Sequence, residues 1–258
     1  MCLLLIANKI HPGYKLIIAA NRDEFYKRPT LQANFWKENE KLLAGRDLEA
    51  GGTWMGITKA GRFSAITNFR DFHNPDKENA PSRGGLTTGF LLSDISSKKY
   101  SENLLKNSDA FNGFNLIYGI NTDLFYFSNQ TNVVIKLPKG LFGLSNAMLD
   151  TDWPKVTESK KFISELISTN KISTQGLFKI LADTKPAADG QLPDTGIGPE
   201  REKALSANFI KTPQYGTRCS TVILIDNNDK VIFTERTFER GSEEFSEVNF
   251  EFNLEKKE

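Results

Sequence analysis

The sequence is poor in cysteine and histidine, the two residue types that most often form crosslinks or bind metals. Its two cysteines, Cys2 and Cys219, are too few for a disulfide framework, and such a pair is typical of a reducing compartment. His11 and His73 lie far apart in turn or loop contexts, and neither has a carboxylate at a metal-ligand spacing. Gly-x-Gly-x-x-Gly and P-loop motifs are also missing. We therefore expect no metal and no cofactor.

Charge and hydrophobicity exclude two further classes of partner. The 33 basic and 32 acidic residues nearly cancel, so no overall field attracts nucleic acid. No apolar run approaches the roughly 18 residues of a membrane-spanning helix. The apolar stretch 3–7 is too short for a secretory signal, and Lys9 follows it closely. We predict a cytoplasmic protein without a nucleic-acid partner or an integral membrane segment, and the sequence indicates no particular oligomeric state.

Short apolar runs separated by turn residues fill the first half of the chain and return near its end, which predicts antiparallel sheet. The predicted strands are 2–8, 15–20, 53–58, 62–68, 115–120, 124–128, 132–137, 141–145, 220–226, 231–235 and 248–254. Helical spacing predicts helices over 84–97 and 175–183, and a third that starts at Pro154 after an Asp152 cap and includes Ile167. The order lacks βαβ alternation and predicts one α+β domain, 1–258, with antiparallel sheets and helices packed outside them.

Cys2 is the residue best suited to chemistry. Met1 is readily removed when the next residue is small, and its removal leaves Cys2 with a thiol and a free α-amino group. Such an amine has a pKa of about 8, so at neutral pH part of it is unprotonated and can act as general base for the thiol. No histidine is needed. The alternative is that Cys2 is only a small apolar residue that opens a buried strand.

A polar block follows the second predicted strand and forms a second candidate feature. If the first two strands pair through the turn at 11–13, Cys2 lies close to Asn21, Arg22 and Asp23. A guanidinium there would lower the thiol pKa and hold polar groups of a substrate, and Asp23 could orient the α-amine. The alternative is an exposed polar turn with an internal ion pair.

Motifs spread in order along the whole chain resemble the NRDE family, which includes the transport and Golgi organization protein 2 relatives. The matching blocks are Met1-Cys2, Asn21-Arg22-Asp23-Glu24, Arg28-Pro29, Ala44-Gly45-Arg46-Asp47, Gly51-Gly52-Thr53-Trp54-Met55-Gly56, Thr67-Asn68-Phe69-Arg70, Ser82-Arg83-Gly84, Gly143-Leu144-Ser145-Asn146, Trp153-Pro154-Lys155-Val156 and Tyr215-Gly216-Thr217-Arg218-Cys219-Ser220-Thr221. That family is similar in turn to N-terminal-nucleophile hydrolases of the choloylglycine and penicillin V acylase type. The resemblance implies a four-layer αββα sandwich.

The resemblance also implies roles for residues that match its motifs. These are Cys2 as nucleophile, Arg22 and Asp23 as its partners, Asn68 and Asn146 as amide donors toward an oxyanion or substrate, and Arg218 as a second cation. Asn68, Asn146 and Arg218 stand at the ends of predicted strands; for the two asparagines the alternative is a turn-forming role. The acylases separate their arginine and aspartate by two residues, whereas Arg22 and Asp23 are adjacent, so Glu24 is an alternative to Asp23.

Two functions follow from this reading. The first is an amide hydrolase or acyltransferase that acts on a small acyl-amide or acyl-thioester substrate through Cys2. The second is a non-catalytic lipid- or haem-handling or trafficking protein on the same scaffold, because the resemblance associates relatives with secretory organisation and with such ligands. Fold alone does not decide between them. The reactivity of Cys2 does, because catalysis needs a free α-amine and a reactive thiolate.

Overall fold

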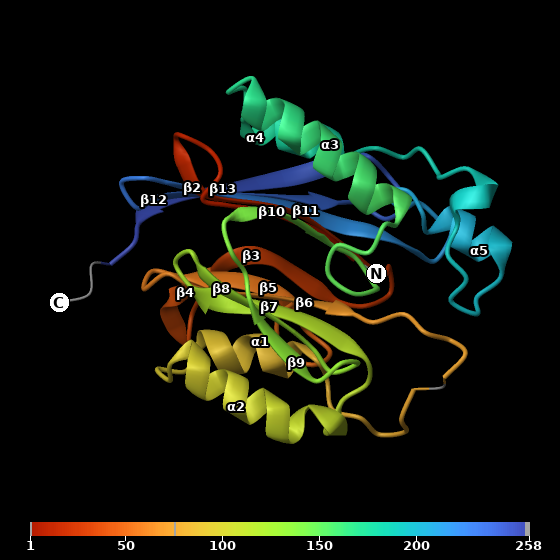
Figure 1. Cartoon of the computed structure of the whole chain (residues 1–258), viewed down its shortest axis with the longest axis horizontal. Helices are drawn as coiled ribbons and strands as arrows, with labels where there is room; N and C mark the ends of the chain where they lie inside the picture. Colours follow the sequence, from red (N-terminus) through yellow and green to blue (C-terminus); the bar gives the residue numbers. More distant parts are fainter. Residues whose placement is uncertain (1, 75, 256–258) are drawn as a thin grey trace.

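Two antiparallel β-sheets lie face to face in the computed structural model, which describes residues 2–74 and 76–255. One pair of helices covers the outer face of each sheet, so the layers follow the order α, β, β, α (Figure 1). This arrangement confirms the predicted α+β sandwich of the N-terminal-nucleophile hydrolase type.

The first sheet contains the first and last strands of the described chain and has the strand order β10-β1-β2-β11-β12-β13. Its strands are β1 (Cys2–Asn8), β2 (Tyr14–Phe25), β10 (Gly140–Leu144), β11 (Tyr215–Asp226), β12 (Lys230–Phe238) and β13 (Phe245–Asn253). The central strands β1, β2 and β11 are almost entirely buried because this sheet is covered on both faces. Their near-continuous apolar runs are therefore a consequence of their central position.

The second sheet is a meander with the order β3-β4-β5-β6-β7-β8-β9. Its strands are β3 (Thr30–Trp36), β4 (Asn39–Asp47), β5 (Met55–Thr58), β6 (Arg62–Asn68), β7 (Phe114–Ile120), β8 (Asp123–Ser128) and β9 (Val133–Lys136). The sequence did not predict β3 and β4. In β3 the buried side chains of Ala33 and Trp36 are separated by the exposed Asn34 and the half-buried Phe35, and β4 opens with polar residues. β3 is an edge strand and lacks the apolar run that marks a central strand, whereas β4 has only the short buried run 42–45 between polar residues.

The helices are α1 (Gly84–Leu91), α2 (Ser97–Asn107), α3 (Pro154–Ser168), α4 (Thr174–Leu181) and α5 (Pro199–Ala204), with 3₁₀ turns at Ser108–Ala110 and Asp189–Gln191. The predicted helix 84–97 is wrong in length, because α1 ends at Leu91 and a second helix, α2, follows it. Pro154 does occupy the first turn of α3, but Trp153 holds the N-cap position, so the predicted Asp152 cap is wrong.

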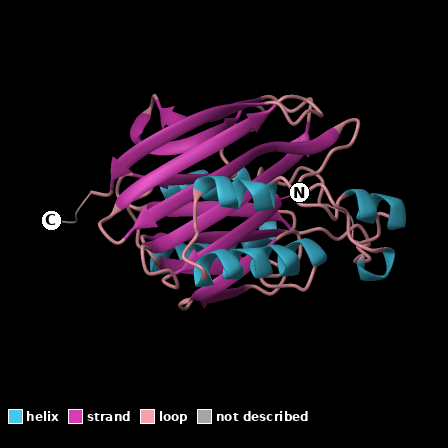
Figure 2. Cartoon of the chain, turned by 90° about the horizontal axis from the view of Figure 1, so that it is seen from above, coloured by secondary structure: helices cyan, strands magenta, loops and turns pink. Residues whose placement is uncertain are grey.

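The apolar core lies between the sheets, and smaller clusters lie beneath the helices. Alternate residues of β1 show the division: Leu4 and Ile6 pack toward the second sheet, whereas Leu3 and Leu5 pack against α3 and α4. The start of β1 lies at the end of the sandwich where α5 stands apart from the other helices (Figures 1 and 2). The candidate site, which includes the start of β1, lies at this end of the sandwich.

Candidate active site

Cys2 is the first residue of β1 and lies at the open end of the β1–β2 hairpin. In this antiparallel ladder Cys2 is the direct partner of Arg22, and Arg22 is in turn the partner of Cys219 on β11. Cys2 is half-buried, whereas Cys219 is buried in the middle of its strand. The register therefore brings Cys2 and Arg22 side by side on the face that looks toward the second sheet.

The polar block after Ala20 is part of a strand and not a turn. β2 continues to Phe25 because β11 pairs with it along its length, so the predicted strand end at Ala20 is wrong. Successive residues of a strand point to opposite faces. Asn21 and Asp23 accordingly face the helices α3 and α4, whereas Arg22 faces the second sheet.

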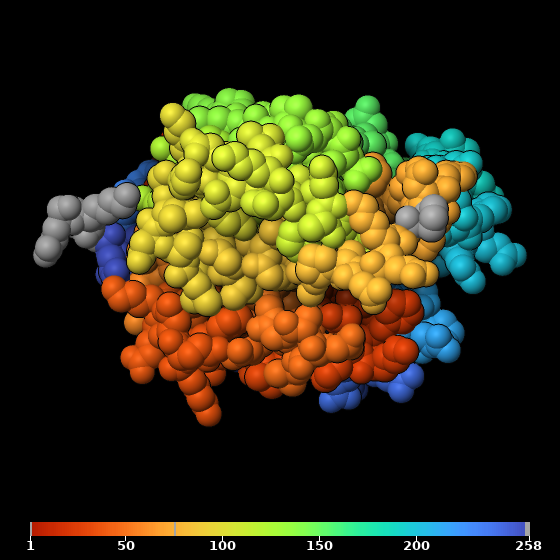
Figure 3. Space-filling model, turned by 90° about the horizontal axis from the view of Figure 1, so that it is seen from below, coloured from red at the N-terminus to blue at the C-terminus, as the bar shows by residue number. Residues whose placement is uncertain are grey.

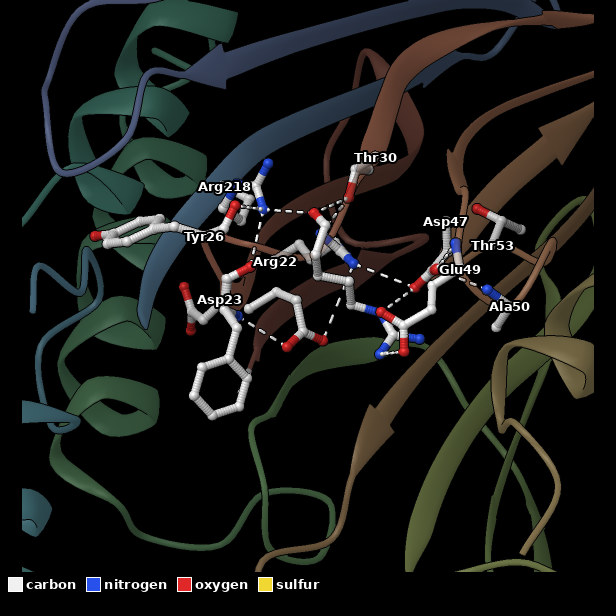
Figure 4. A network of polar contacts seen from close by, with 12 residues as sticks. Arg22, Asp23, Tyr26, Thr30, Asp47, Glu49, Ala50, Thr53 and Arg218 are labelled. Carbon is white, nitrogen blue, oxygen red and sulfur yellow. Dashed lines mark hydrogen bonds and ion pairs between the residues drawn. The ribbon is translucent and has the colours of Figure 1, made fainter. Parts of the chain in front are cut away.

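Arg22 is fixed by contacts from the second sheet. Its guanidinium carbon lies 4.3 Å from the ring centroid of Trp54. One guanidinium nitrogen lies 3.5 Å from the carboxylate of Asp47, and another donates a hydrogen bond of 3.3 Å to the hydroxyl of Thr30 (Figure 4). Asp47 also accepts a hydrogen bond of 2.6 Å from Arg28. The cation beside Cys2 is thus buried, stacked and neutralised in part.

Asp23 points away from Arg22, toward the side of the sheet that carries α3 and α4 (Figure 4). Its carboxylate accepts a hydrogen bond of 2.7 Å from the hydroxyl of Thr217, and its backbone carbonyl accepts one of 2.8 Å from Tyr215. Burial raises the pKa of Asp23, and the nearby charge of Lys155 is the strongest influence that opposes the rise. Asp23 is therefore a buried carboxyl group whose charge depends on its neighbours.

Glu24, the alternative to Asp23, lies on the same side of β2 as Arg22. It is half-buried, and its carboxylate is 4.0 Å from the guanidinium of Arg22. The same side chain accepts a hydrogen bond of 2.8 Å from the backbone N–H of Phe25. The two acidic residues thus approach the start of β1 from opposite faces of one strand.

Asn146 follows β10 and joins the start of β1 to the end of β6. Its side-chain oxygen accepts a hydrogen bond of 3.3 Å from the backbone nitrogen of Cys2, and its amide nitrogen donates one of 2.7 Å to the backbone carbonyl of Asn68. The hydroxyl of Ser145 donates a bond of 2.9 Å to the carbonyl of Cys2. Asn146 is fully buried, while Asn68 is exposed. Cys2, Asn68 and Asn146 therefore meet at one point.

Arg218 lies within β11, at a bulge between Thr217 and Cys219, so its predicted place at a strand end is wrong. Its guanidinium donates hydrogen bonds of 3.0 Å and 2.9 Å to the backbone carbonyls of Phe25 and Arg28 (Figure 4). Burial, followed by the positive charge of Arg22, lowers the pKa of Arg218. This arginine is near Arg22, and its hydrogen bonds hold the turn after β2 against β11.

The surroundings of the Cys2 thiol work against its ionisation. Burial raises the thiol pKa, and the opposing influences of Arg22 and of the Asp23 backbone do not overcome it. The expected effect of Arg22 has the predicted direction, but burial outweighs it. The cavity beside Cys2 has a volume of about 20 Å³ and reaches Trp54 and Met55 of the second sheet. It has room for about one water molecule.

Sequence reasoning missed a buried charged cluster at the same end of the molecule. Arg70 lies just after β6, pairs with Glu202 of α5 at 2.9 Å and lies over the ring of Trp153 at 4.7 Å. Lys155 follows in the first turn of α3 and is 5 % exposed. From below, the segment after β6 (orange) lies against the segment around α5 (cyan), where Phe72 and Thr195 share a backbone hydrogen bond (Figure 3). Only the family motifs marked Arg70 and Lys155.

A second buried carboxylate, Glu235 on β12, was also missed. Its two oxygens accept hydrogen bonds of 2.6 Å from the backbone of Ala33 and 3.0 Å from the hydroxyl of Thr221. It thereby connects the two sheets. Burial raises the pKa of Cys219 well above its usual value, and the charge of Glu235 raises it further. A buried thiol whose pKa is raised in this way is a poor nucleophile.

Two negative findings concern the described residues as a whole. Between residues 2 and 255, with residue 75 set aside, no group of three or more His, Cys, Asp and Glu side chains is arranged to hold a metal ion. In the same part of the chain, no helix combines the length and the apolar content that spanning a bilayer requires.

Comparisons with known proteins show which family this sequence matches. Residues 1–240 match the family described as Transport and Golgi organisation 2. The Transport and Golgi organization 2 homolog of Mus musculus is 34% identical over 277 residues, which cover 98% of this chain and 99% of that protein. The Transport and Golgi organization protein 2 of Drosophila melanogaster is 27% identical over 267 residues, 92% of each chain.

Among solved structures, the chain resembles the Caenorhabditis elegans N-acylethanolamine-hydrolyzing acid amidase (NAAA) ortholog, with a TM-score of 0.52 and 13% identity over 86% of this chain and 92% of that one. At this identity the likeness concerns the fold, which is of the N-terminal-nucleophile hydrolase type. The match of sequence over nearly the whole chain concerns the family: this chain belongs to the Transport and Golgi organisation 2 family.

Proposed function

We propose that this chain is an N-terminal cysteine hydrolase or acyltransferase that acts on a small acyl-amide or acyl-thioester substrate. The observation that carries the proposal is the junction of Cys2, Asn146 and Asn68, where the side-chain oxygen of Asn146 holds the nitrogen of Cys2 at 3.3 Å. That nitrogen becomes a free α-amine once Met1 is removed, and Met1 lies outside the described residues. A thiol and an amine on one residue supply both nucleophile and base.

In the proposed mechanism, the sulfur of Cys2 attacks the substrate carbonyl while the thiol proton passes to the α-amine. The carbon–nitrogen or carbon–sulfur bond of the substrate then breaks, and the α-ammonium returns the proton to the leaving group. Water, or an acceptor in the transferase reaction, attacks the resulting thioester and releases Cys2. The exposed amide of Asn68 is the better candidate for oxyanion stabilisation, since the amide nitrogen of Asn146 is already bonded to a backbone carbonyl.

The first experiment separates an activated Cys2 from a structural one. Intact mass reports whether Met1 is absent from the protein isolated from cells, and alkylation across pH with peptide mapping reports the reactivity of each cysteine. Amide and thioester substrates are then tested with wild type, Cys2→Ala and Cys219→Ala. We expect a covalent acyl adduct on Cys2, loss of turnover by at least about 1,000-fold in Cys2→Ala, and no comparable loss in Cys219→Ala. Retained Met1, or equal turnover in Cys2→Ala, contradicts the proposal.

A non-catalytic role is the second candidate, and two observations favour it. The thiol pKa is raised by burial, and the cavity beside it holds only about 20 Å³. A larger cleft, of about 1180 Å³, lies instead between α3, α4 and the segment 183–191, and Phe162 and Leu166 contribute apolar surface to it. A lipid- or haem-type ligand held there would bind equally to wild type and Cys2→Ala, whereas ligand retention that depends on an acyl–Cys2 bond would support catalysis.

A further inference from the structure

Lys155 occupies a position that helix stability does not explain. It is the second residue of α3, 5 % exposed, and its ammonium nitrogen is buried without a hydrogen-bond partner among the described residues. The N-terminus of a helix carries a partial positive charge, which disfavours a cation there. A buried ammonium without partners also costs free energy that an apolar side chain of similar size would not. The chain thus retains a charge where packing alone favours methionine or leucine.

Ionisable groups from β1, β2, α5 and the segment after β6 lie near this ammonium group. Asp23 of β2 and Cys2 of β1 lie toward the sheet, and Arg70, with its partner Glu202 of α5, lies toward the end of the sandwich. Burial lowers the pKa of Lys155 to about 8, Asp23 is the main influence against this shift, and Arg70 adds to the lowering. Asp23 is thus the anion to which Lys155 is most strongly coupled.

The coupling is mutual, because Lys155 is also the strongest influence that favours the charged form of Asp23. The side chains lie on the same side of the first sheet: Asp23 points away from Arg22 toward the helices (Figure 4), and Lys155 belongs to the buried face of α3. Asp23 directly follows the residue that pairs with Cys2 in the ladder. The two groups are therefore both buried on the helix-facing side of the first sheet, behind the start of β1, and we call them the charge pair.

We propose that Lys155 is a positioning residue for Cys2: its ammonium group keeps Asp23 ionised, so that this carboxylate binds the amino group that removal of Met1 leaves on Cys2. The role of Lys155 in catalysis rests on the proposed function, whereas the electrostatic coupling between Lys155 and Asp23 does not. A neutral Asp23 would be a weaker anchor for the amine, because hydrogen bonds to an ionised carboxylate are stronger than those to a neutral acid.

The test measures the protonation of Asp23 directly. Carbon-13 spectra of protein labelled at the aspartate carboxyl carbons are recorded across pH, with Asp23→Asn used to assign the signal. In Lys155→Met the proton affinity of Asp23 should rise at least about tenfold, one pKa unit, while Lys155→Arg should stay near wild type. Lys161→Met is the matched control, because Lys161 lies on the same helix with its side chain 66% exposed. A role in packing alone would change stability without moving the Asp23 titration.

If Lys155→Met does not fold, the reciprocal measurement decides. In Asp23→Asn, the Lys155 ammonium group should lose its proton at a pH at least about one unit below the wild-type midpoint, a tenfold fall in proton affinity, and its nitrogen-15 signal reports this midpoint. An unchanged titration in either experiment overturns the inference, even if wild type forms an acyl adduct on Cys2. A shifted Asp23 titration in a protein that never forms an adduct upholds the charge pair and refutes the proposed function.

Discussion

The two faces of β2 differ in what their polar residues do. On the helix-facing side, Asn21 donates hydrogen bonds of 2.8 Å to the backbone carbonyls of Leu181 and Asn208, and its oxygen accepts one of 2.5 Å from Ser220. On the other side, Arg22 lies between Trp54 and Cys2. One motif of consecutive residues thus contributes to two environments, one that assembles the fold and one that borders the candidate nucleophile.

The largest expected effect comes from the side that assembles the fold. Asn21→Ala leaves two buried carbonyl groups and one hydroxyl without their partner, so it should lower the free energy of unfolding by about 4 kcal/mol. Urea unfolding measures the loss. The matched control is Asn34→Ala, since Asn34 is an exposed strand residue and its removal should cost less than about 1 kcal/mol. Equal losses in the two variants would mean that Asn21 is not structurally special.

The second effect concerns the pH dependence of stability. The pKa of Lys155 is lowered to about 8 in the folded state, so between that pH and its unfolded value of about 10.4 the unfolded state binds more protons. Lys155 alone should therefore raise the free energy of unfolding by roughly 3 kcal/mol across this window. The raised pKa values of the Cys2 and Cys219 thiols act in the opposite direction, because the unfolded state loses these protons at lower pH than the folded state.

The change in the free energy of unfolding between low and high pH should therefore be roughly 3 kcal/mol less favourable in Lys155→Met than in wild type, whereas Lys161→Met should match wild type. Urea unfolding at pH 7.5 and at pH 10 compares the three proteins at both ends of the window. If wild type and Lys155→Met show the same change between the two pH values, Lys155 does not titrate in this window, and its coupling to Asp23 is refuted.

The third effect should appear in reactivity more than in stability. Arg22 lowers the pKa of the Cys2 thiol, although burial dominates, so Arg22→Met should slow alkylation of Cys2 at pH 7 by about fivefold. Stability should change by only about 1 kcal/mol, because the desolvation cost of the buried guanidinium disappears with its contacts. Arg22→Lys, which keeps the charge, is the control. A loss of stability as large as that of Asn21→Ala would erase the contrast between the two faces.

The sequence predicted the central strands because they depend on apolar periodicity, whereas the order of the four layers was implied by the family resemblance. It failed at β3 and β4, whose pairing is decided by the sheet to which they add and not by their own polar residues. It also failed at the end of β2, because a polar block reads as a turn unless the partner strand β11 is known to extend beside it. Long-range pairing is the information that a local pattern lacks.

The site shows the same limit. The hairpin turn was enough to place Arg22 beside Cys2, and the family motifs marked Asn68 and Asn146, which meet at Cys2. Nothing in the spacing indicated that Arg218 would bond to backbone carbonyls, or that Lys155 would be buried opposite Asp23. Those facts depend on the packing of a helix and a bulged strand against β2, which no pattern within one element records.

The smallest expected effect decides between the two acidic residues. Glu24 is half-buried, and its carboxylate lies 4.0 Å from the guanidinium of Arg22, whereas Asp23 is 2 % exposed and bonded to Thr217. Glu24→Gln retains an oxygen for the backbone N–H of Phe25, so it should change the free energy of unfolding by less than about 0.5 kcal/mol and the alkylation rate of Cys2 by less than about twofold.

Asp23→Asn should exceed both limits, because it removes a buried charge that is coupled to Lys155 and to the thiol. Stopped-flow alkylation and urea unfolding on the two variants complete the comparison. If Glu24→Gln has the larger effect on Cys2, the acidic residue that binds the amino group of Cys2 is Glu24, on the face of β2 that carries Arg22. The polar residues on the helix-facing side of β2 would then only stabilise the fold, and all residues of β2 that influence Cys2 would lie on the opposite face.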